Sequence, residues 1–403
     1  MNKERLWTKE FIVITIINFF LLLSMYLLLV TIVPFVTGEF NVSTSMAGFV
    51  AGIFVIGCLF GRLATGRYME RIGFNKTLLF GLIFFFLTTA LYFAAFNIYV
   101  LLIIRFLHGI SVGIATSAAG SIVALQIPSS RSGEGISYFS MSNVLSTAIG
   151  PLVGILLSQY ADYNMIFLFS LVLGSIALVI SFSIQEHVVE TEELPKVANK
   201  KKILSSFLEY KVIPISLVMF IGSFTYSSVL SFLTVYADEI NLIEVASFFF
   251  LVFAMAISIS RPFTGRLLDA KGANIIIYPC LIIFAIGMLV LSQANNGIIL
   301  LLAAIFIGIG YGNLQSITQA LAIKVVPKNR VGLATSTYFI FLDLGFGLGP
   351  LIHGTLIKTI GYRGLYLSLV FVIIFLFILY FFLHGRKERK YSRKEDESIV
   401  SEN

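Results

Sequence analysis

Long apolar runs, separated by short polar stretches, repeat along almost the whole chain. A helix that crosses a membrane needs about 20 mostly apolar residues, so each run predicts one spanning helix. The runs lie near residues 10–37, 44–65, 77–97, 98–127, 136–160, 163–184, 211–238, 243–264, 273–294, 297–325, 333–358 and 363–384. The pattern therefore predicts an all-α membrane protein with twelve transmembrane helices.

The second six runs repeat the first six. Residues 62–75 and 261–274 align at an offset of 199, with six of fourteen positions identical. The same offset pairs Pro128 with Pro327, Arg131 with Arg330, Gly133 with Gly332, and Gly150-Pro151 with Gly349-Pro350. We expect two six-helix bundles, 1–184 and 211–384, joined by a cytoplasmic central loop, 185–210, and followed by a basic tail, 385–403. Such a parallel repeat suits a transporter whose halves rock to expose a central site alternately.

Composition excludes a soluble domain. The chain is 58% hydrophobic and 12% charged, whereas soluble domains are roughly 45–50% apolar and about 25% charged. The net charge of +7 reflects basic residues in the loops, so topology explains it and nucleic-acid binding does not. With the N-terminus inside, the Lys and Arg residues fall in cytoplasmic segments, except Arg105, Lys358 and Arg363. The prediction is a multi-pass membrane protein with both termini cytoplasmic, and the Phe-, Ile- and Lys-rich composition favours a bacterial cell membrane.

The stretch after the second run resembles a motif of the major facilitator superfamily, G-x-L-A-D-R-x-G-R-K. The matching residues are Gly66, Glu70, Arg71 and Gly73, and in the second copy Gly265, Asp269 and Gly272. Glu70 stands where the motif has Asp. We expect the first glycines to allow close helix approach and the last to adopt positive φ in a tight turn. The resemblance implies that a carboxylate and a guanidinium here latch neighbouring helices in one transport state. A loop that only sets topology is the alternative.

Two further motifs extend the resemblance over about residues 5–385. Arg105 and His108 precede Gly109 as in the superfamily's R-x-x-x-G motif, where the arginine is thought to influence protonation of a nearby acid. Snorkelling of Arg105 to the interface and a merely hydrogen-bonded His108 are the alternatives. Gly150, Pro151 and Gly154 resemble the G-P-x-x-G core of the twelve-span drug:proton antiporter branch, which implies export; ordinary small-residue packing is the alternative.

One carboxylate, Asp343, lies deep within a run. Desolvation favours its neutral form, so it is a candidate proton carrier; a structural hydrogen-bonding role is the alternative. Glu10 and Glu134 lie at helix ends, where solvent or loop lysines would satisfy them. Relatives line their cavity with the first, fourth, seventh and tenth spans, which here offer Asn18, Tyr26, Phe224, Tyr226, Asn313 and Gln315.

This aromatic and neutral-polar set suits a bulky, partly apolar solute. The leading hypothesis is a proton-coupled exporter of such molecules. An exporter of a specific metabolite, such as a metal chelator or small acid, is the second, and a non-transporting receptor is a remote third. No residue cluster predicts an enzyme, a metal site or a cofactor. We expect a small-molecule substrate, protons and the lipid bilayer as partners, no nucleic acid, and a monomer.

Overall fold

The computed structural model describes residues 5–42, 44–184 and 207–386. Most of the expected central loop and nearly all of the expected basic tail lie outside these ranges. Every regular element among the described residues is helical. The α-helices are α1 Lys9–Phe40, α2 Thr44–Ile72, α3 Phe74–Ala90, α4 Ile98–Gln126, α5 Ser132–Tyr160, α6 Tyr163–Ser181, α7 Ile213–Glu239, α8 Ile243–Lys271, α9 Asn274–Ser292, α10 Gly297–Ile307, α11 Asn313–Lys324 and α12 Val331–Tyr380.

The twelve predicted spans correspond to helices of the structure. Eleven stretches of the described residues are long and apolar enough to cross a membrane. The last of these, Lys328–Gly385, contains α12, which is interrupted at Gly361 (φ 67°) and so consists of two successive helices. One span combines α10 and α11, which are continuous through a π-helical turn, η5, at Gly308–Gly312. The all-α fold with twelve spans is confirmed.

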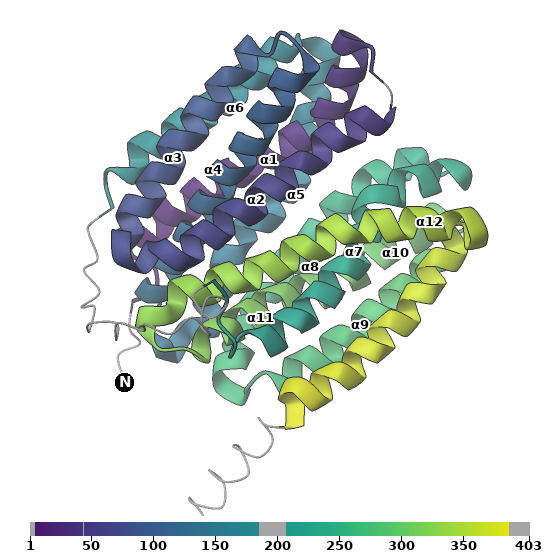
Figure 1. The fold of residues 1–403 in the computed structure, drawn as a ribbon. Helices are drawn as coiled ribbons and strands as arrows, with labels where there is room; N and C mark the ends of the chain where they lie inside the picture. Colours follow the sequence, from purple (N-terminus) through teal and green to yellow (C-terminus); the bar gives the residue numbers. More distant parts are fainter. Residues whose placement is uncertain (1–4, 43, 185–206, 387–403) are drawn as a thin grey trace, which may run out of the picture. The chain divides into compact units, whose positions relative to one another are not determined.

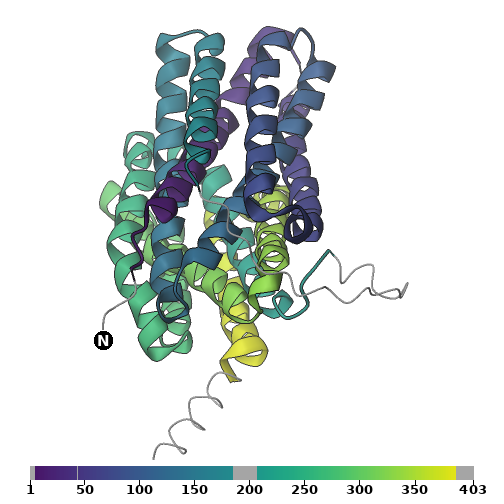
Figure 2. The ribbon, with the colours of Figure 1, turned by 90° about the vertical axis from the view of Figure 1, so that its left-hand side faces the viewer.

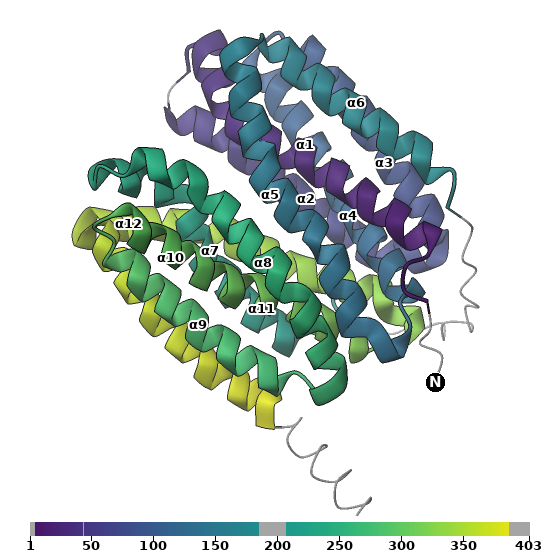
Figure 3. The same ribbon diagram turned by 180° about the vertical axis from the view of Figure 1, so that it is seen from behind.

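The chain divides into two compact units. The first consists of Met1–Pro128, Phe139–Tyr210 and Val326–Ile340, and the second of Ser129–Tyr138, Lys211–Val325 and Phe341–Asn403. Figures 1 and 3 show the helices from opposite sides, and in Figure 2 the blue and teal helices of the first unit stand side by side. Each unit thus includes a short segment from the other half of the sequence: the start of α5 or the start of α12.

The internal repeat extends to the helix boundaries. Adding 199 to the bounds of α2 gives those of α8, and the short 3₁₀ turns η2, Ser129–Arg131, and η6, Lys328–Arg330, match in the same way. Asn97 and Asn296, also 199 apart, both cap their helices by accepting backbone N–H groups. The two copies therefore share local structure as well as sequence.

One boundary differs from the prediction. We expected the second and eighth spans to end near residues 65 and 264, with the motif in a loop, but α2 continues to Ile72 and α8 to Lys271. The apolar pattern weakens here because charged side chains occupy the last two turns of both helices. A turn of one or two residues then connects each helix to the next: Gly73 (φ 99°) alone lies before α3, and Gly272 (φ 80°) with Ala273 lies before α9. The positive φ expected at both glycines is confirmed.

Helices α2 and α4 pack with their backbones almost in contact. Gly57 and Gly61 on α2, and Gly109 and Gly113 on α4, leave no room for a Cβ atom, since each faces a backbone carbonyl oxygen of the other helix. Small residues at four-residue spacing allow this approach between membrane helices. The contact brings the buried side of α4, which carries Arg105 and His108, against α2.

We expect Gly109→Ala to destabilise the first unit. The new Cβ would collide with the carbonyl oxygen of Phe54, which is backbone and has little room to move. Overpacking of this kind costs roughly 1–3 kcal/mol. Gly52→Ala on α2 is the matched control, because nothing lies within 4 Å of its added Cβ. The fraction of purified protein that stays monodisperse after heating checks this. Equal losses for both variants would contradict close α2–α4 packing.

Candidate functional site

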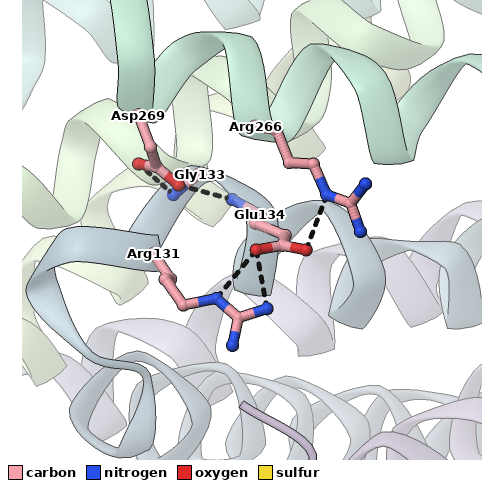
Figure 4. Close-up of polar contacts among 5 residues, drawn as sticks. All are labelled: Arg131, Gly133, Glu134, Arg266 and Asp269. Carbon is pink, nitrogen blue, oxygen red and sulfur yellow. Dashed lines mark hydrogen bonds and ion pairs between the residues drawn. The ribbon is translucent and has the colours of Figure 1, made fainter. Parts of the chain in front are cut away.

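In the second unit, the carboxylate of Asp269 caps the N-terminus of α5. Its Oδ1 accepts the backbone N–H of Gly133 at 2.8 Å, and its Oδ2 accepts that of Glu134 at 2.9 Å (Figure 4). Lys324 at the end of α11 also binds Oδ1, at 2.8 Å. Asp269 lies in the last turn of α8. We call Asp269 with Gly133 and Glu134 the second cap.

The side chain of Glu134 connects two arginines beside this cap. Its Oε2 accepts from Arg131 Nε at 2.8 Å, and its Oε1 accepts from Arg266 Nε at 2.9 Å (Figure 4). The side chain of Glu134 is only 7% exposed, while that of Arg266 is 62% exposed. Pairing a nearly buried carboxylate with two guanidinium groups offsets the cost of removing its charge from water.

The first unit repeats the arrangement with Glu70, in the last turns of α2. Its Oε1 accepts the backbone N–H of Leu333 at 3.4 Å, and Gly332 is a second backbone donor. Both amides belong to the first turn of α12. We call Glu70 with Gly332 and Leu333 the first cap. The aligned residues of the two repeats, Glu70 and Asp269, thus act on aligned helix N-termini.

A helix N-terminus attracts a carboxylate for two reasons. Its first four N–H groups have no partner within the helix, and the helix dipole places partial positive charge there. In each cap the carboxylate comes from one half of the sequence and the helix from the other. The contact can therefore form in one arrangement of these helices and break in another.

Glycines at the first motif position let the helices of each cap approach. A Cβ on Gly66 would lie 2.9 Å from the Cβ of Ser336, and one on Gly265 would lie 2.6 Å from Ser137 Oγ. These two serines are also 199 residues apart. The close approach expected at both glycines is confirmed. Arg71, by contrast, is exposed at the end of α2 and makes none of the cap contacts among the described residues.

The Gly-Pro motif of α5 lies against α1. A Cβ on Gly150 would be 2.7 Å from the Cβ of Tyr26, and one on Gly154 would be 3.0 Å from the carbonyl oxygen of Leu27. Pro151 lies between them within α5. In the second unit Gly349, the match of Gly150, lies against Ser227 of α7. Close packing at this motif is thus a feature of both units.

Arg105 is buried inside the first unit and does not reach an interface by snorkelling. Its Nε donates to the carbonyl oxygen of Val50 at 3.3 Å, and its Nη1 donates to Tyr92 Oη at 3.3 Å. The guanidinium lies 4.6 Å from the ring centroid of Phe54. Only 1% of Arg105 is exposed. A carbonyl dipole, a phenol and an aromatic face therefore surround this cation.

His108 shares the same hydroxyl. Its Nδ1 lies 3.0 Å from Tyr92 Oη, and its ring packs against Phe54 and Phe85. Arg105 already donates to this hydroxyl, which leaves the O–H free to donate to His108 Nδ1. The structure thus brings Arg105 and His108 together through Tyr92, a residue not selected from the sequence. It lies just after α3, in the 3₁₀ turn η1, Leu91–Ala94.

Three of the six residues predicted to line a cavity are buried and contact other side chains of the same unit. Asn18 donates to Ser142 and Asn143, at 2.8 and 2.9 Å. Asn313 accepts from Thr264 at 2.7 Å and donates to Ser260 at 2.8 Å. Tyr226 stacks on Tyr311 with ring centroids 4.1 Å apart. The other three are half-buried: Tyr26, Phe224 and Gln315.

The remaining charged and titratable candidates lie in different surroundings. Asp343, in the second unit, is half-buried rather than fully buried. His353, on the same helix, is fully buried against the ring of Phe224, at 4.5 Å between centroids. Glu10 accepts from Gln126 at 2.9 Å. No group of three or more His, Cys, Asp or Glu side chains within the described ranges could hold a metal ion.

The contacts of several residues at the site were not predicted from the sequence. Glu134 was expected to meet solvent or lysines, but it meets two arginines. Glu209, which precedes α7, forms an ion pair with Arg330 and had no predicted role. Arg62 and Arg261 were counted with the loops, yet both are buried within helices, α2 and α8. The repeat itself was the available signal, because it aligns Arg131 with Arg330 and Arg62 with Arg261.

A family model described as Major Facilitator Superfamily matches residues 14–298 and 243–401. The chain belongs to this superfamily. It is therefore a transporter rather than an enzyme, and small molecules are the substrates of such proteins.

Individual relatives agree with this assignment. An uncharacterized MFS-type transporter of Methanocaldococcus jannaschii is 27% identical over 334 residues, which are 79% of this chain and 86% of the relative. A multi-drug resistance efflux pump PmrA homolog of Lactococcus lactis subsp. lactis is 26% identical over 369 residues, 88% of this chain and 85% of the relative. The crystal structure of the human organic anion transporter MFSD10 has the same fold, with a TM-score of 0.75 at 17% identity over 92% of this chain and 98% of that one.

We expect Asp269→Asn to loosen the start of α5. The variant loses the charge of the cap and one of two acceptor oxygens, and a hydrogen bond to a charged group contributes about 1.5–3 kcal/mol. Hydrogen exchange should become roughly tenfold faster in the peptide that covers residues 129–138. Glu70→Gln should have a smaller effect on residues 331–340, because its bond to Leu333 is 3.4 Å long.

Asp238→Asn is the control for these two variants, since Asp238 is exposed and outside both caps. It should leave exchange in both peptides unchanged. A larger effect from Glu70→Gln than from Asp269→Asn would contradict the ranking of the caps.

Proposed function

We propose that this protein is a secondary active exporter, driven by inward proton movement, that carries bulky, partly apolar small molecules by alternating access. We place it as a monomer in a bacterial cell membrane, with both termini and the central loop in the cytoplasm. The observation that carries export is the similarity, over 88% of the chain, to a relative named a multi-drug resistance efflux pump homolog. The Gly-Pro motif packed between α5 and α1 supports the same direction.

The caps supply the two-state element that alternating access requires. A carboxylate bound at a helix N-terminus is stabilised by about 0.3–1 kcal/mol at an exposed site and up to about 2 kcal/mol when partly buried. Two such caps, with the ion pairs of Glu134, bias the equilibrium toward the state in which the helix ends meet. Solute binding need supply only a differential free energy of similar size to reverse it.

Arg105 is our candidate for coupling transport to protons in the first unit. Its guanidinium is held by neutral groups among the residues described, so its positive charge lacks a carboxylate partner there. A buried, fixed cation favours deprotonation of any acid that comes near and attracts an anionic group of a solute. His108 is linked to it through Tyr92. In the second unit, Asp343 remains our candidate proton carrier.

Export of a specific metabolite, such as a metal chelator or small acid, is the second candidate function. The specific observation in its favour is the lack of a carboxylate on α1 at Asn18, whose amide is already bonded to Ser142 and Asn143. A site with a buried cation and no such acid suits an anionic solute better than a lipophilic cation.

Proton movement in liposomes that contain the purified protein tests the proposal. Dyes, antibiotics and anionic chelators are added to vesicles that report internal pH, with wild type beside Arg105→Ala and Asp343→Asn. We expect a compound that drives proton flux in wild type to drive at least roughly tenfold less in both variants, because each removes a charge that couples protonation to transport. Asp238→Asn, an exposed control, should behave as wild type.

The outcomes separate the candidates. Solute movement without proton flux would rule out proton coupling by these residues. Flux with chelators alone would favour the specific-metabolite exporter over the multidrug one.

A further inference from the structure

The two caps differ at one aligned position. The offset of 199 pairs Arg131 with Arg330 and Arg266 with Arg67, but it pairs Glu134 with Leu333. In the second cap, Glu134 holds both arginines. A leucine can hold neither. The first cap therefore lacks, within its own helix, the acid that links the corresponding arginines.

Arg330 and Arg67, the arginines beside the first cap, nevertheless have partners, and both partners come from one short segment. Glu209 forms an ion pair with Arg330. The ring of Phe207 lies under the guanidinium of Arg67, 4.6 Å from its centroid. Phe207–Tyr210 belongs to the first unit and directly precedes the part of the chain that leads into α7. One segment thus contacts both arginines, whose counterparts in the second cap, Arg131 and Arg266, both bind Glu134.

The segment is fixed against α12 by its backbone as well. The N–H of Glu209 donates to Thr337 Oγ1 at 2.9 Å, and the side chain of Glu209 is only 8% exposed. A nearly buried carboxylate needs a cation, and Arg330 supplies it. An aromatic face stabilises an arginine without any carboxylate. The three contacts therefore hold the segment, the end of α2 and the start of α12 together.

We propose that Phe207–Glu209 is a working part of the first cap, in which Glu209 and Phe207 replace the missing acid at position 333 and position Arg330 and Arg67. The segment between the two halves of the sequence then contributes to the equilibrium between transport states. This inference rests on the proposed function, since it assumes that the caps hold one of those states.

Distances between spin labels within each unit test it in the full-length protein. With Cys58 and Cys280 replaced by Ala, one label pair is Ile72→Cys with Lys328→Cys in the first unit. The matched pair in the second unit is Lys271→Cys with Ser129→Cys, since Lys271 aligns with Ile72 and Ser129 aligns with Lys328 in the repeat. All four positions are exposed and outside the contacts described for the caps.

We expect Glu209→Gln and Phe207→Ala each to raise the ratio of long to short distances by roughly three- to tenfold, as expected for loss of one partly buried ionic or cation–π contact. Tyr210→Ala should not change the ratio, because that side chain is 52% exposed. Leu333→Glu in the Glu209→Gln background should restore the wild-type ratio by supplying the acid that Glu134 supplies in the other cap. This rescue keeps the test decisive if Glu209→Gln alone folds poorly.

Two patterns of result would contradict the inference. If Glu134→Gln and Asp269→Asn lengthen the distances but Glu209→Gln and Phe207→Ala do not, the segment has no part in the cap, while the proposed function stands. If none of the four changes the distances, the caps do not hold a transport state, and the inference falls together with that part of the proposed function.

Discussion

Hydrocarbon offers no hydrogen-bond partner, and this constraint accounts for most of what the structure contains. Every regular element described is a helix because only helices and closed barrels satisfy their backbone groups internally in a bilayer. The same constraint acts on side chains. Arg105 is surrounded by a carbonyl oxygen, a phenol and an aromatic ring, and Arg261 donates to the carbonyl oxygen of Gly312 at 3.0 Å. Helix packing provides these partners, which is why closely spaced glycines and buried charge occur together.

The caps supply hydrogen-bond acceptors at the helix ends, where backbone N–H groups have no acceptor within the helix. A carboxyl group from a neighbouring helix accepts hydrogen bonds from them, and in its charged form it is also attracted to the helix dipole. Duplication placed this solution in both units, but the two copies are not equal. The second cap has two short bonds and a lysine, whereas the first has a longer bond, and beside it Glu209, at the end of the central loop, forms an ion pair with Arg330.

The sequence predicts the fold well because apolar length is a direct measure of membrane crossing. It misplaces the ends of α2 and α8 because their last turns carry charged residues, which lower the apolar signal without interrupting the helix. The positive φ of Gly73 and Gly272 was predictable from the motif. The partners of Glu134 and Glu209 were not, since Arg266 is 132 residues from Glu134, and only folding brings such residues together. Nor can polarity alone show that Asn18 bonds to Ser142 rather than facing a cavity.

The short turns at Gly73 and Gly272 have a mechanical consequence. A connection of one residue between α2 and α3, or of two between α8 and α9, has little slack, so the two helices of each pair cannot tilt independently at that end. Glu70 and Asp269 lie within one turn of these glycines. A force applied at either carboxylate is therefore transmitted to two helices at once. Each helical hairpin, α2–α3 or α8–α9, is then expected to tilt as one unit, so that a small displacement at the cap moves the far ends of both helices.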